Sequence, residues 1–317
     1  MKPNLADVHV SVPLTTASVG WANAQEEFVW PQFFPNVGVD QQAGVYYVWS
    51  EEDFLRLEAA QRAPGALAVE GEVDLTTQSY KTTQYALRRK IPKEIQAQSD
   101  AAVRPDVNAM LFCTDNVMRR MEKKFMTEIF AASVFTDLVA GTDFTTFDTV
   151  GGDPVKDIQM NLLVQSRKIG GRKLNKILIG AEADIWLKNN ADIKDRVKHT
   201  SSGPITNELL AQLFGVDQYL VSTAVENTAA EGATASYSAI AGKSMLAVFS
   251  PASAALDTPA AGYNIVNKSE PGTGANGLRT YDYYVEERHS RFIEVQCDIA
   301  FEVVSTVCGV FFPTVIA

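Results

Sequence analysis

The strongest hydrophobic periodicity in the chain follows Arg104. Pro105 suits a first helical turn. Apolar or small residues then recur at spacings of three and four, at Val107, Met110, Thr114, Val117, Met121, Phe125 and Ile129. This spacing predicts a long amphipathic helix with that face turned inward. The other face carries charges of both signs, at Arg119, Arg120, Glu122, Lys123 and Lys124. Mixed charges on a helix favour a solvated face over a binding patch.

Residues 1–45 show no sustained periodicity and predict an extended arm. Prolines at positions 3, 13, 31 and 35 interrupt a stretch that is rich in aromatic residues, namely Trp21, Phe28, Trp30, Phe33 and Phe34. So many aromatic side chains are unfavourable in water. The arm is therefore expected to lie against another surface, either its own or that of a neighbour.

Two strand-like arms come next, VYYVWS at 45–50 and a longer one across 66–87, with a turn signal at Pro64-Gly65. They predict a long hairpin or projecting loop. Apolar residues alternate only loosely with polar ones in the second arm, so neither face resembles a core face. Such a hairpin needs a partner surface.

The region 153–227 alternates between helix and strand signals and predicts an α/β unit. Asp153-Pro154 opens a helix, 176–180 is a strand, helices follow around 182–189 and 207–215, and 218–225 is a second strand. Loops at 226–243 and 268–278 are rich in small residues and are expected to be exposed, near the centre of any ring of subunits, and tolerant of change. The chain then continues in strand formers to its end, without a helix signal.

Composition narrows the possible functions. The 317 residues carry a net charge of -10, which argues against phosphate neutralisation as a binding mode and leaves only weak, non-specific contact with DNA. No apolar run is long enough for a bilayer, so no membrane association is expected. The three cysteines, Cys113, Cys297 and Cys308, and the three histidines, His9, His199 and His289, form no metal-ligand spacing. Buried reduced thiols in a reducing cytoplasm are the expectation.

Three motifs imitate active sites. Gly272, Gly274 and Gly277 spell GxGxxG, but the sequence after them is strand-like, whereas a dinucleotide site needs a helix there. Gly242-Lys243-Ser244 resembles the end of a phosphate-binding loop, yet Tyr237 stands where that motif needs glycine.

The third imitation is the group Glu286, Glu287 and His289. In a strand Glu287 and His289 would share one face and Glu286 the other, which indicates a polar strand edge. There is also no GxSxG elbow. The sequence therefore predicts no catalytic, cofactor-binding or metal-binding residue, and no enzyme.

The order of the parts resembles the major capsid proteins of tailed bacteriophages. KILIGAEADIWLKNNADIKDRV is similar to a segment of the family's A-domain, and SRFIEVQCDIAFEVVSTVCGVFFPTVIA to its strand returning through the P-domain. The resemblance implies an α+β, HK97-like capsid fold. Its parts would be an N-terminal arm at 1–45, an E-loop at 46–92, a P-domain with a long spine helix at 93–152, an α/β A-domain at 153–278, and C-terminal strands returning through the P-domain at 279–317.

The resemblance also implies a function without an active site or cofactor. Subunits would assemble as hexamers and pentamers into an icosahedral shell around the phage double-stranded DNA, with the arm and E-loop lying across neighbours. Portal and scaffold or decoration proteins would be further partners, and the subunit, made in the host bacterial cytoplasm, would end in the virion. Many relatives begin with a helical scaffolding segment, and its absence before the arm implies a separate scaffold or a self-sufficient subunit.

Two alternatives stay open. An encapsulin-like cellular compartment shell shares this fold but typically begins with a helix, against which the proline-spaced arm argues. An α/β enzyme with an unrecognised site would need a closed pocket with perturbed groups within 153–250.

Overall fold

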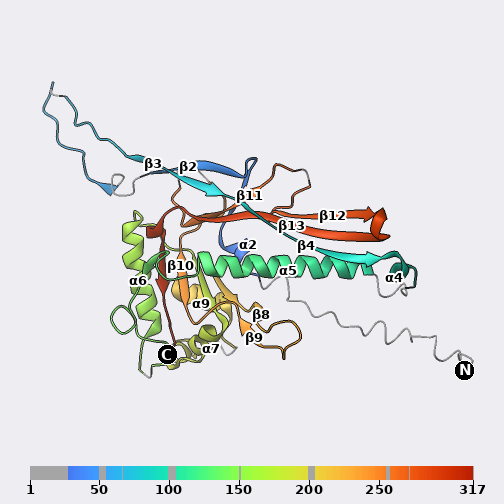
Figure 1. Cartoon of the computed structure of the whole chain (residues 1–317). Coiled ribbons are helices and arrows are strands. Elements are labelled where there is room, and N and C mark those ends of the chain that lie inside the picture. Colours follow the sequence, from blue (N-terminus) through green and yellow to red (C-terminus); the bar gives the residue numbers. More distant parts are fainter. Residues whose placement is uncertain are drawn as a thin grey trace, which may run out of the picture.

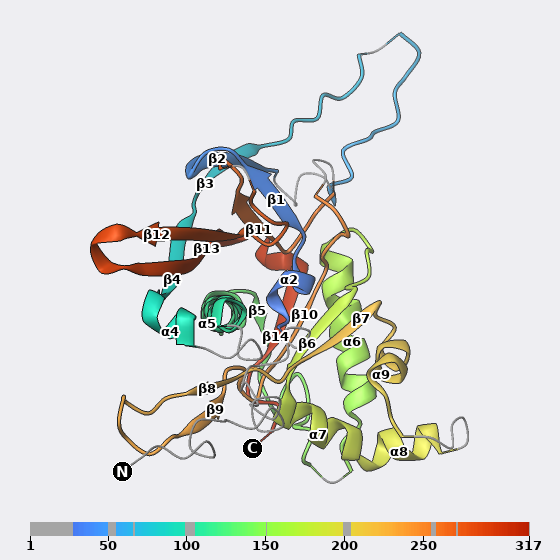
Figure 2. The same cartoon turned by 90° about the vertical axis from the view of Figure 1, so that its right-hand side faces the viewer.

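A computed structural model describes residues 28–49, 55–65, 67–98, 105–149, 151–198, 204–254, 258–270 and 272–316. A long helix lies between two β-sheets, and a loop projects far from the body (Figure 1). Figure 2 shows the helix end-on, with helices gathered around one of the sheets. Residues 1–27 of the arm predicted at 1–45, including His9 and Trp21, lie outside the described residues, as does His199.

The predicted long helix is present as α5, Pro105–Glu128. Cys113, Val117, Met121 and Phe125 are buried on one side of it, in the four-residue steps of a core-facing stripe. The prediction is wrong in the first turns, because Val107 and Met110 are 43% and 39% exposed. Only one side of the helix contacts strands there. Val107 and Met110 therefore continue the apolar pattern without a strand that covers them.

One sheet is built around the long strand β13, Ser290–Val303. Along the first part of its length β13 pairs with β4, Thr83–Pro92, on one edge and with β12, Leu278–Val285, on the other. Further along it pairs with β11, Gly262–Asn267, which in turn pairs with β1, Asn36–Val39. The β-rich ending predicted for the chain is confirmed, with only the short turns η3, Glu286–Arg288, and η4, Thr306–Cys308, interrupting it.

The second sheet is the α/β unit. Its strands run in the order β5, Thr136–Asp137; β14, Gly309–Phe312; β10, Met245–Val248; β6, Lys176–Gly180; and β7, Gln218–Ser222. Helices α6, Pro154–Lys168; α7, Ala181–Asn189; α8, Ala191–Val197; and α9, Asn207–Phe214, accompany it. The predicted helices and strands are confirmed, whereas α8 is additional. The two sheets draw strands from distant parts of the chain, and the division into five parts stays a prediction.

Local chemistry explains why these elements begin and end where they do. Asp153 caps α6 by accepting a hydrogen bond from the Lys156 amide, and Pro154 occupies the first turn. Gly215 ends α9 in the left-handed conformation, at φ 72°. Every residue of β6 and of β10 is buried, and apart from Lys176 their sequences have no charged or polar side chain, as is typical of strands covered on both faces.

Smaller elements complete the fold. β2, Ala43–Trp49, pairs antiparallel with β3, Leu75–Lys81, in a ribbon at the base of the projecting loop, and α4, Lys93–Gln98, precedes α5. The 226–243 region is more ordered than the loop predicted for it, because β8, Val225–Asn227, and β9, Tyr237–Ala239, pair as a hairpin. It is exposed over most of its length, as expected.

Candidate assembly surfaces

The aromatic segment at 28–34 is part of this subunit's own core. It forms the short helix α2, Trp30–Phe33, and Phe28, Trp30, Phe33 and Phe34 are all at most 1% exposed. The rings of Phe33 and Phe34 pack against Phe125, with centroids 5.7 and 5.9 Å apart. The arm is expected to lie against either its own subunit or a neighbour, and residues 28–34 pack against their own subunit.

Glu122 binds the beginning of α2. Its Oε2 accepts hydrogen bonds from the backbone amides of Val29 and Trp30, at 3.1 and 3.2 Å, and its Oε1 accepts one from the Ser222 hydroxyl at 3.1 Å. The side chain is fully buried, so its assignment to a solvated helix face is wrong. Burial raises the pKa of Glu122 to about 7, although the three hydrogen bonds oppose that shift.

The end of α2 is held by donors. Lys176 Nζ donates to the carbonyls of Gln32 and Phe33, at 2.7 and 3.0 Å, and Asn264 Nδ2 donates to those of Trp30 and Phe34. Burial lowers the pKa of Lys176. Because a four-residue helix leaves most of its backbone groups unpaired, these side chains make a socket for residues 28–34. No local pattern in the sequence indicates the socket, since its parts lie on α5, β6, β7 and β11.

The remaining charges on α5 make contacts within the subunit. Arg119 pairs with Asp115, and Lys123 Nζ lies 2.7 Å from a carboxylate oxygen of Glu226 on β8. Lys124 Nζ donates to Thr83 Oγ1 at 2.8 Å. These contacts join α5 to the hairpin β8–β9 and to β4, so they account for the charges without a binding patch.

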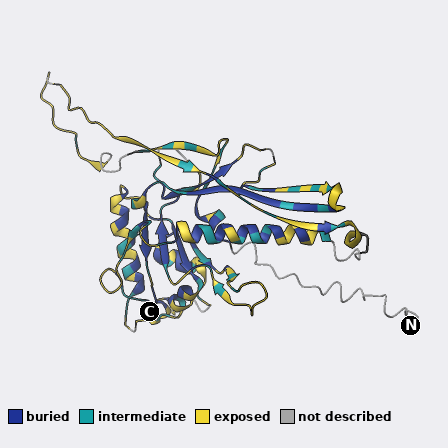
Figure 3. Ribbon diagram, viewed as in Figure 1, coloured by how far each residue is buried: buried dark blue, intermediate teal, exposed yellow. Residues whose placement is uncertain are grey.

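The projecting loop exposes large apolar side chains. Leu57 and Leu67 are 99% and 96% exposed, and the loop is coloured as exposed along nearly its whole length in Figure 3. A soluble protein that works as a monomer rarely exposes such a group of apolar side chains. The predicted projecting loop is present. Within the described part of the chain no surface covers its apolar side chains.

The motifs that imitate active sites serve as connections. Gly272 and Gly277 have positive φ, at 84° and 75°, in the loop between β11 and β12, so a strand and not a helix follows them. Gly242 to Ser244 lead into β10. Glu286 to Arg288 form the turn η3 between β12 and β13, and His289 follows it at φ 44°, so the polar strand edge predicted there is wrong.

All three cysteines are buried, and burial raises the pKa of Cys297 to about 12. Cys308 lies in η4. Within the described ranges no group of histidine, cysteine and carboxylate side chains is arranged to hold a metal ion. None of the described helices is both long and apolar enough to cross a membrane.

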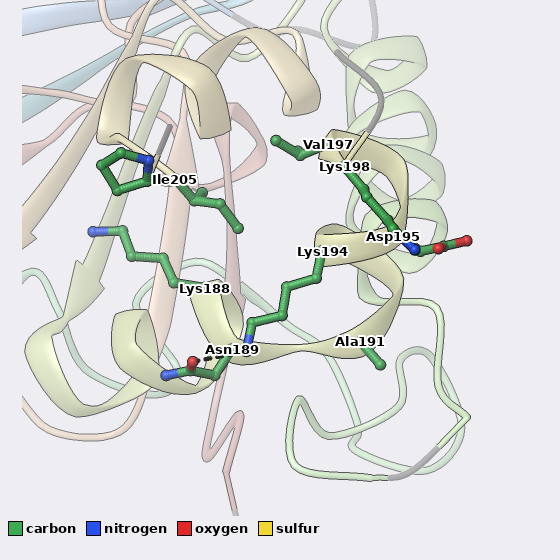
Figure 4. A pocket seen from close by; sticks show the side chains of 9 residues that line it. Lys188, Asn189, Ala191, Lys194, Asp195, Val197, Lys198 and Ile205 are labelled. Atoms are coloured by element: carbon green, nitrogen blue, oxygen red, sulfur yellow. Dashed lines mark hydrogen bonds between the residues drawn. The ribbon is translucent and has the colours of Figure 1, made fainter. Parts of the chain in front are cut away.

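A hollow lies between α7, α8 and the segment before α9 (Figure 4). Three lysines border it, Lys188, Lys194 and Lys198. Lys188 Nζ contacts Asp184 and Asn207, and Lys194 Nζ contacts Asn189. Lys188 thus links α7 to the start of α9, and Lys194 links α8 to the end of α7. These contacts hold helices together, and the described residues around the hollow do not bring an acid, a base and a nucleophile to one point.

Comparisons by sequence and by structure both match this chain to phage capsid proteins. No family model matches the chain. The major capsid protein of Burkholderia phage BcepMu is 26% identical over 223 residues, covering 67% of this chain and 68% of that protein. The capsid structure of cyanophage P-SCSP1u matches 93% of this chain and 89% of its own, with a TM-score of 0.59 and 10% identity. The chain has the HK97-like capsid fold.

In the vocabulary of the HK97-like fold, we call α5 the spine helix and the ribbon β2–β3 with its projecting loop the E-loop. A crystal structure of a phage-related protein from Bordetella bronchiseptica matches 96% of this chain and 97% of its own, with a TM-score of 0.66 and 21% identity. The fold is shared beyond phages, since the SrpI encapsulin of Synechococcus elongatus matches 93% of this chain and 91% of its own, at a TM-score of 0.54 and 9% identity.

Proposed function

We propose that this chain is a tailed-phage major capsid protein that self-assembles as hexamers and pentamers into an icosahedral shell enclosing the phage double-stranded DNA. Portal and scaffold or decoration proteins are its further partners in the virion. The shell encloses DNA without reading its sequence, because the net charge of -10 gives the subunit no general attraction to phosphates.

One observation carries the proposal: the E-loop exposes an apolar surface that the described part of its own subunit does not cover. Leu57 and Leu67 are almost fully exposed on a loop that stands away from the body (Figure 1). Burying apolar area contributes about 25 cal/mol per Å², so association with another copy is favourable. A shell covers the E-loop of every subunit in the same way.

Negative-stain microscopy of the purified protein tests the proposal. Closed particles tens of nanometres across, accompanied by a matching radius in light scattering, are expected. A monodisperse monomer or small oligomer over a range of concentration and salt would instead favour the α/β enzyme.

The likeness to the SrpI encapsulin keeps a compartment shell as a second candidate. The two shells differ in what they enclose. Particles isolated from lysing bacteria should protect genome-length DNA from nuclease if this is a phage head. Particles that hold a protein cargo and no nuclease-resistant DNA would favour the encapsulin.

Trypsin should cut free subunits early at Arg56 and Arg62 and spare the same bonds in assembled particles. Both arginines are exposed on the E-loop, and the isolated loop has few contacts that oppose local opening. The two digestions are compared by mass spectrometry, with cleavage elsewhere in the chain as the internal reference. Equal cleavage rates at these bonds in subunits and particles would exclude an intersubunit role for the loop.

Boiled particles should run as one band of 34.6 kDa on reducing gels. Some relatives join subunits through an E-loop lysine that attacks a side-chain amide of the next subunit. Here the first lysine after Lys2 is Lys81, so positions 51–80 supply no amine nucleophile. A ladder of covalent oligomers under reducing conditions would show that another residue makes such a bond.

A further inference from the structure

Helix α6 carries an exposed apolar stripe. Met160, Leu163 and Val164 are 52%, 46% and 45% exposed, on the side opposite to the buried residues of the helix. Their spacing of three and four residues places them in one row. Lys156 and Arg167 extend the row at its two ends, and both are exposed. A surface helix usually has polar residues on this side, so an apolar row with basic ends marks an interaction surface.

The hairpin β8–β9 lies on the other side of the second sheet. Figures 1 and 2 both show it projecting away from α6. One face of the hairpin is turned toward the spine helix, where Glu226 binds Lys123. The opposite face carries Tyr237, which is 75% exposed, and Val225, which is 41% exposed. Tyrosine with an apolar ring and a polar tip is typical of protein interfaces.

The hairpin is held in one conformation within its own subunit. A two-stranded ribbon is marginal in water by itself, but here the Glu226 carboxylate anchors it to α5. Asn227 Oδ1 also accepts hydrogen bonds from the amides of Ala229 and Ser236, at 3.1 and 3.0 Å, and closes the loop at its tip. A surface that is ordered beforehand loses less conformational entropy when it binds.

The charge of the hairpin is opposite to that of the stripe. Within residues 225–239 the charged side chains are Glu226 and Glu231, and the segment has no lysine or arginine. Glu231 is exposed at the tip. The hairpin is therefore apolar and acidic, whereas the stripe on α6 is apolar and basic.

We propose that the hairpin β8–β9 of one copy packs its Tyr237 face on the α6 stripe of the next copy. This inference rests on the proposed shell function and names one contact within it. The Tyr237 ring would lie on Leu163 and its neighbours, and Glu231 would lie near one of the basic ends. Because the two surfaces are different and lie on opposite sides of the subunit, the contact is heterologous, which is the type that closes rings of subunits.

Two other surfaces are apolar and acidic. The E-loop arm 67–75 reads LAVEGEVDL, but it stands on a long projecting loop and must be ordered when it binds. On α7, Ile185 and Trp186 are exposed beside Glu182. Lys243 shares a shallow hollow with Trp186, so that surface carries both signs of charge. The hairpin matches α6 better, because it is ordered beforehand and carries acidic residues alone.

Disulfide trapping tests the contact. Cysteine replaces Ala235 or Ala239, which flank Tyr237 on the same face of β9, together with Met160 or Val164 on α6, in four double variants. All three native cysteines are buried, and a disulfide forms only where the Cα atoms come within about 4.4–6.8 Å. After oxidation of assembled particles, at least one variant should give a ladder of covalent oligomers on non-reducing gels.

Two controls carry Val164→Cys with a cysteine elsewhere. Ser238→Cys lies on the same strand but on the face turned toward α5, and Glu72→Cys lies on the E-loop arm. The ladder in the best hairpin variant should exceed that in either control by about tenfold, since disulfide formation falls steeply with distance. The ladder should extend beyond dimers, because a heterologous contact links each copy to two others.

The outcomes separate the contact from the shell function. Normal particles without a ladder in all four variants, or with a stronger ladder in either control, would overturn the contact and leave the shell function standing. Cross-linked dimers without larger oligomers, or a cross-link within one chain, would also overturn it. Wild-type protein that forms no particles would overturn the shell function itself.

A double-mutant cycle provides a second test that needs no cysteine. Tyr237→Ala and Leu163→Ala should each raise the critical concentration for assembly, measured by light scattering, by about threefold. The double variant should exceed the larger single effect by less than about twofold, because either change already removes the contact. Tyr284→Ala, at a tyrosine of β12 that is 49% exposed, is the control and should combine with Leu163→Ala multiplicatively. Single changes without effect, or multiplicative effects of Tyr237→Ala and Leu163→Ala, would contradict the contact.

Discussion

Replacing Phe125 with alanine should destabilise the subunit by about 3–5 kcal/mol. Phe125 is completely buried on the spine helix. Its ring lies edge-on to Phe301 at 5.3 Å and also contacts Phe33 and Phe34. Truncation therefore opens a cavity where α2, α5 and β13 meet. Urea unfolding of free subunits, followed by tryptophan fluorescence, measures the loss as a lower midpoint, accompanied by a lower soluble yield.

Phe112→Ala is the matched control. It removes the same side chain from the same helix at a position that is 51% exposed. In free subunits this change should cost less than about 1 kcal/mol. Equal midpoints for Phe125→Ala and wild type would contradict the placement of the spine helix in the core.

The second large effect concerns pH. The pKa of Glu122 is raised by burial from its ordinary value of 4.5 to about 7 in the folded protein. Between these values the folded state binds more protons than the unfolded state, so the free energy of unfolding falls as pH rises. The loss from this one group between pH 5 and pH 8 is about 2–3 kcal/mol.

Glu122→Gln should remove that part of the pH dependence. The amide oxygen still accepts from the Val29 and Trp30 amides, and the amide nitrogen can donate to the Ser222 oxygen, so the hydrogen-bonding positions stay filled. Relative to wild type, the variant should gain stability steadily from pH 5 to pH 8. Urea midpoints at both pH values measure this, with other titrating groups cancelling in the difference. An unchanged difference between the two proteins across that range would mean that Glu122 titrates normally.

The sequence by itself determined the elements whose signals are local. Asp153-Pro154 predicted the start of α6 because a capping carboxylate and a proline act on the amides next to them. The short run KILIG predicted β6 because it is rich in strand-forming apolar residues. A strand that is covered on both faces, as β6 is, has such a sequence. The projecting E-loop followed from the absence of a core face in its arms. The HK97-like fold was inferred from the order of these parts.

Only the tertiary structure decided which side chains those elements bury. Glu122 belongs to a charged run on α5 that looks solvated, and its burial depends on α2 and on Ser222 of β7, 100 residues away. Val107 and Met110 continue the apolar stripe but find no strand to cover them. A residue's environment depends on surfaces brought together by folding, and the local sequence does not specify what lies on the other side.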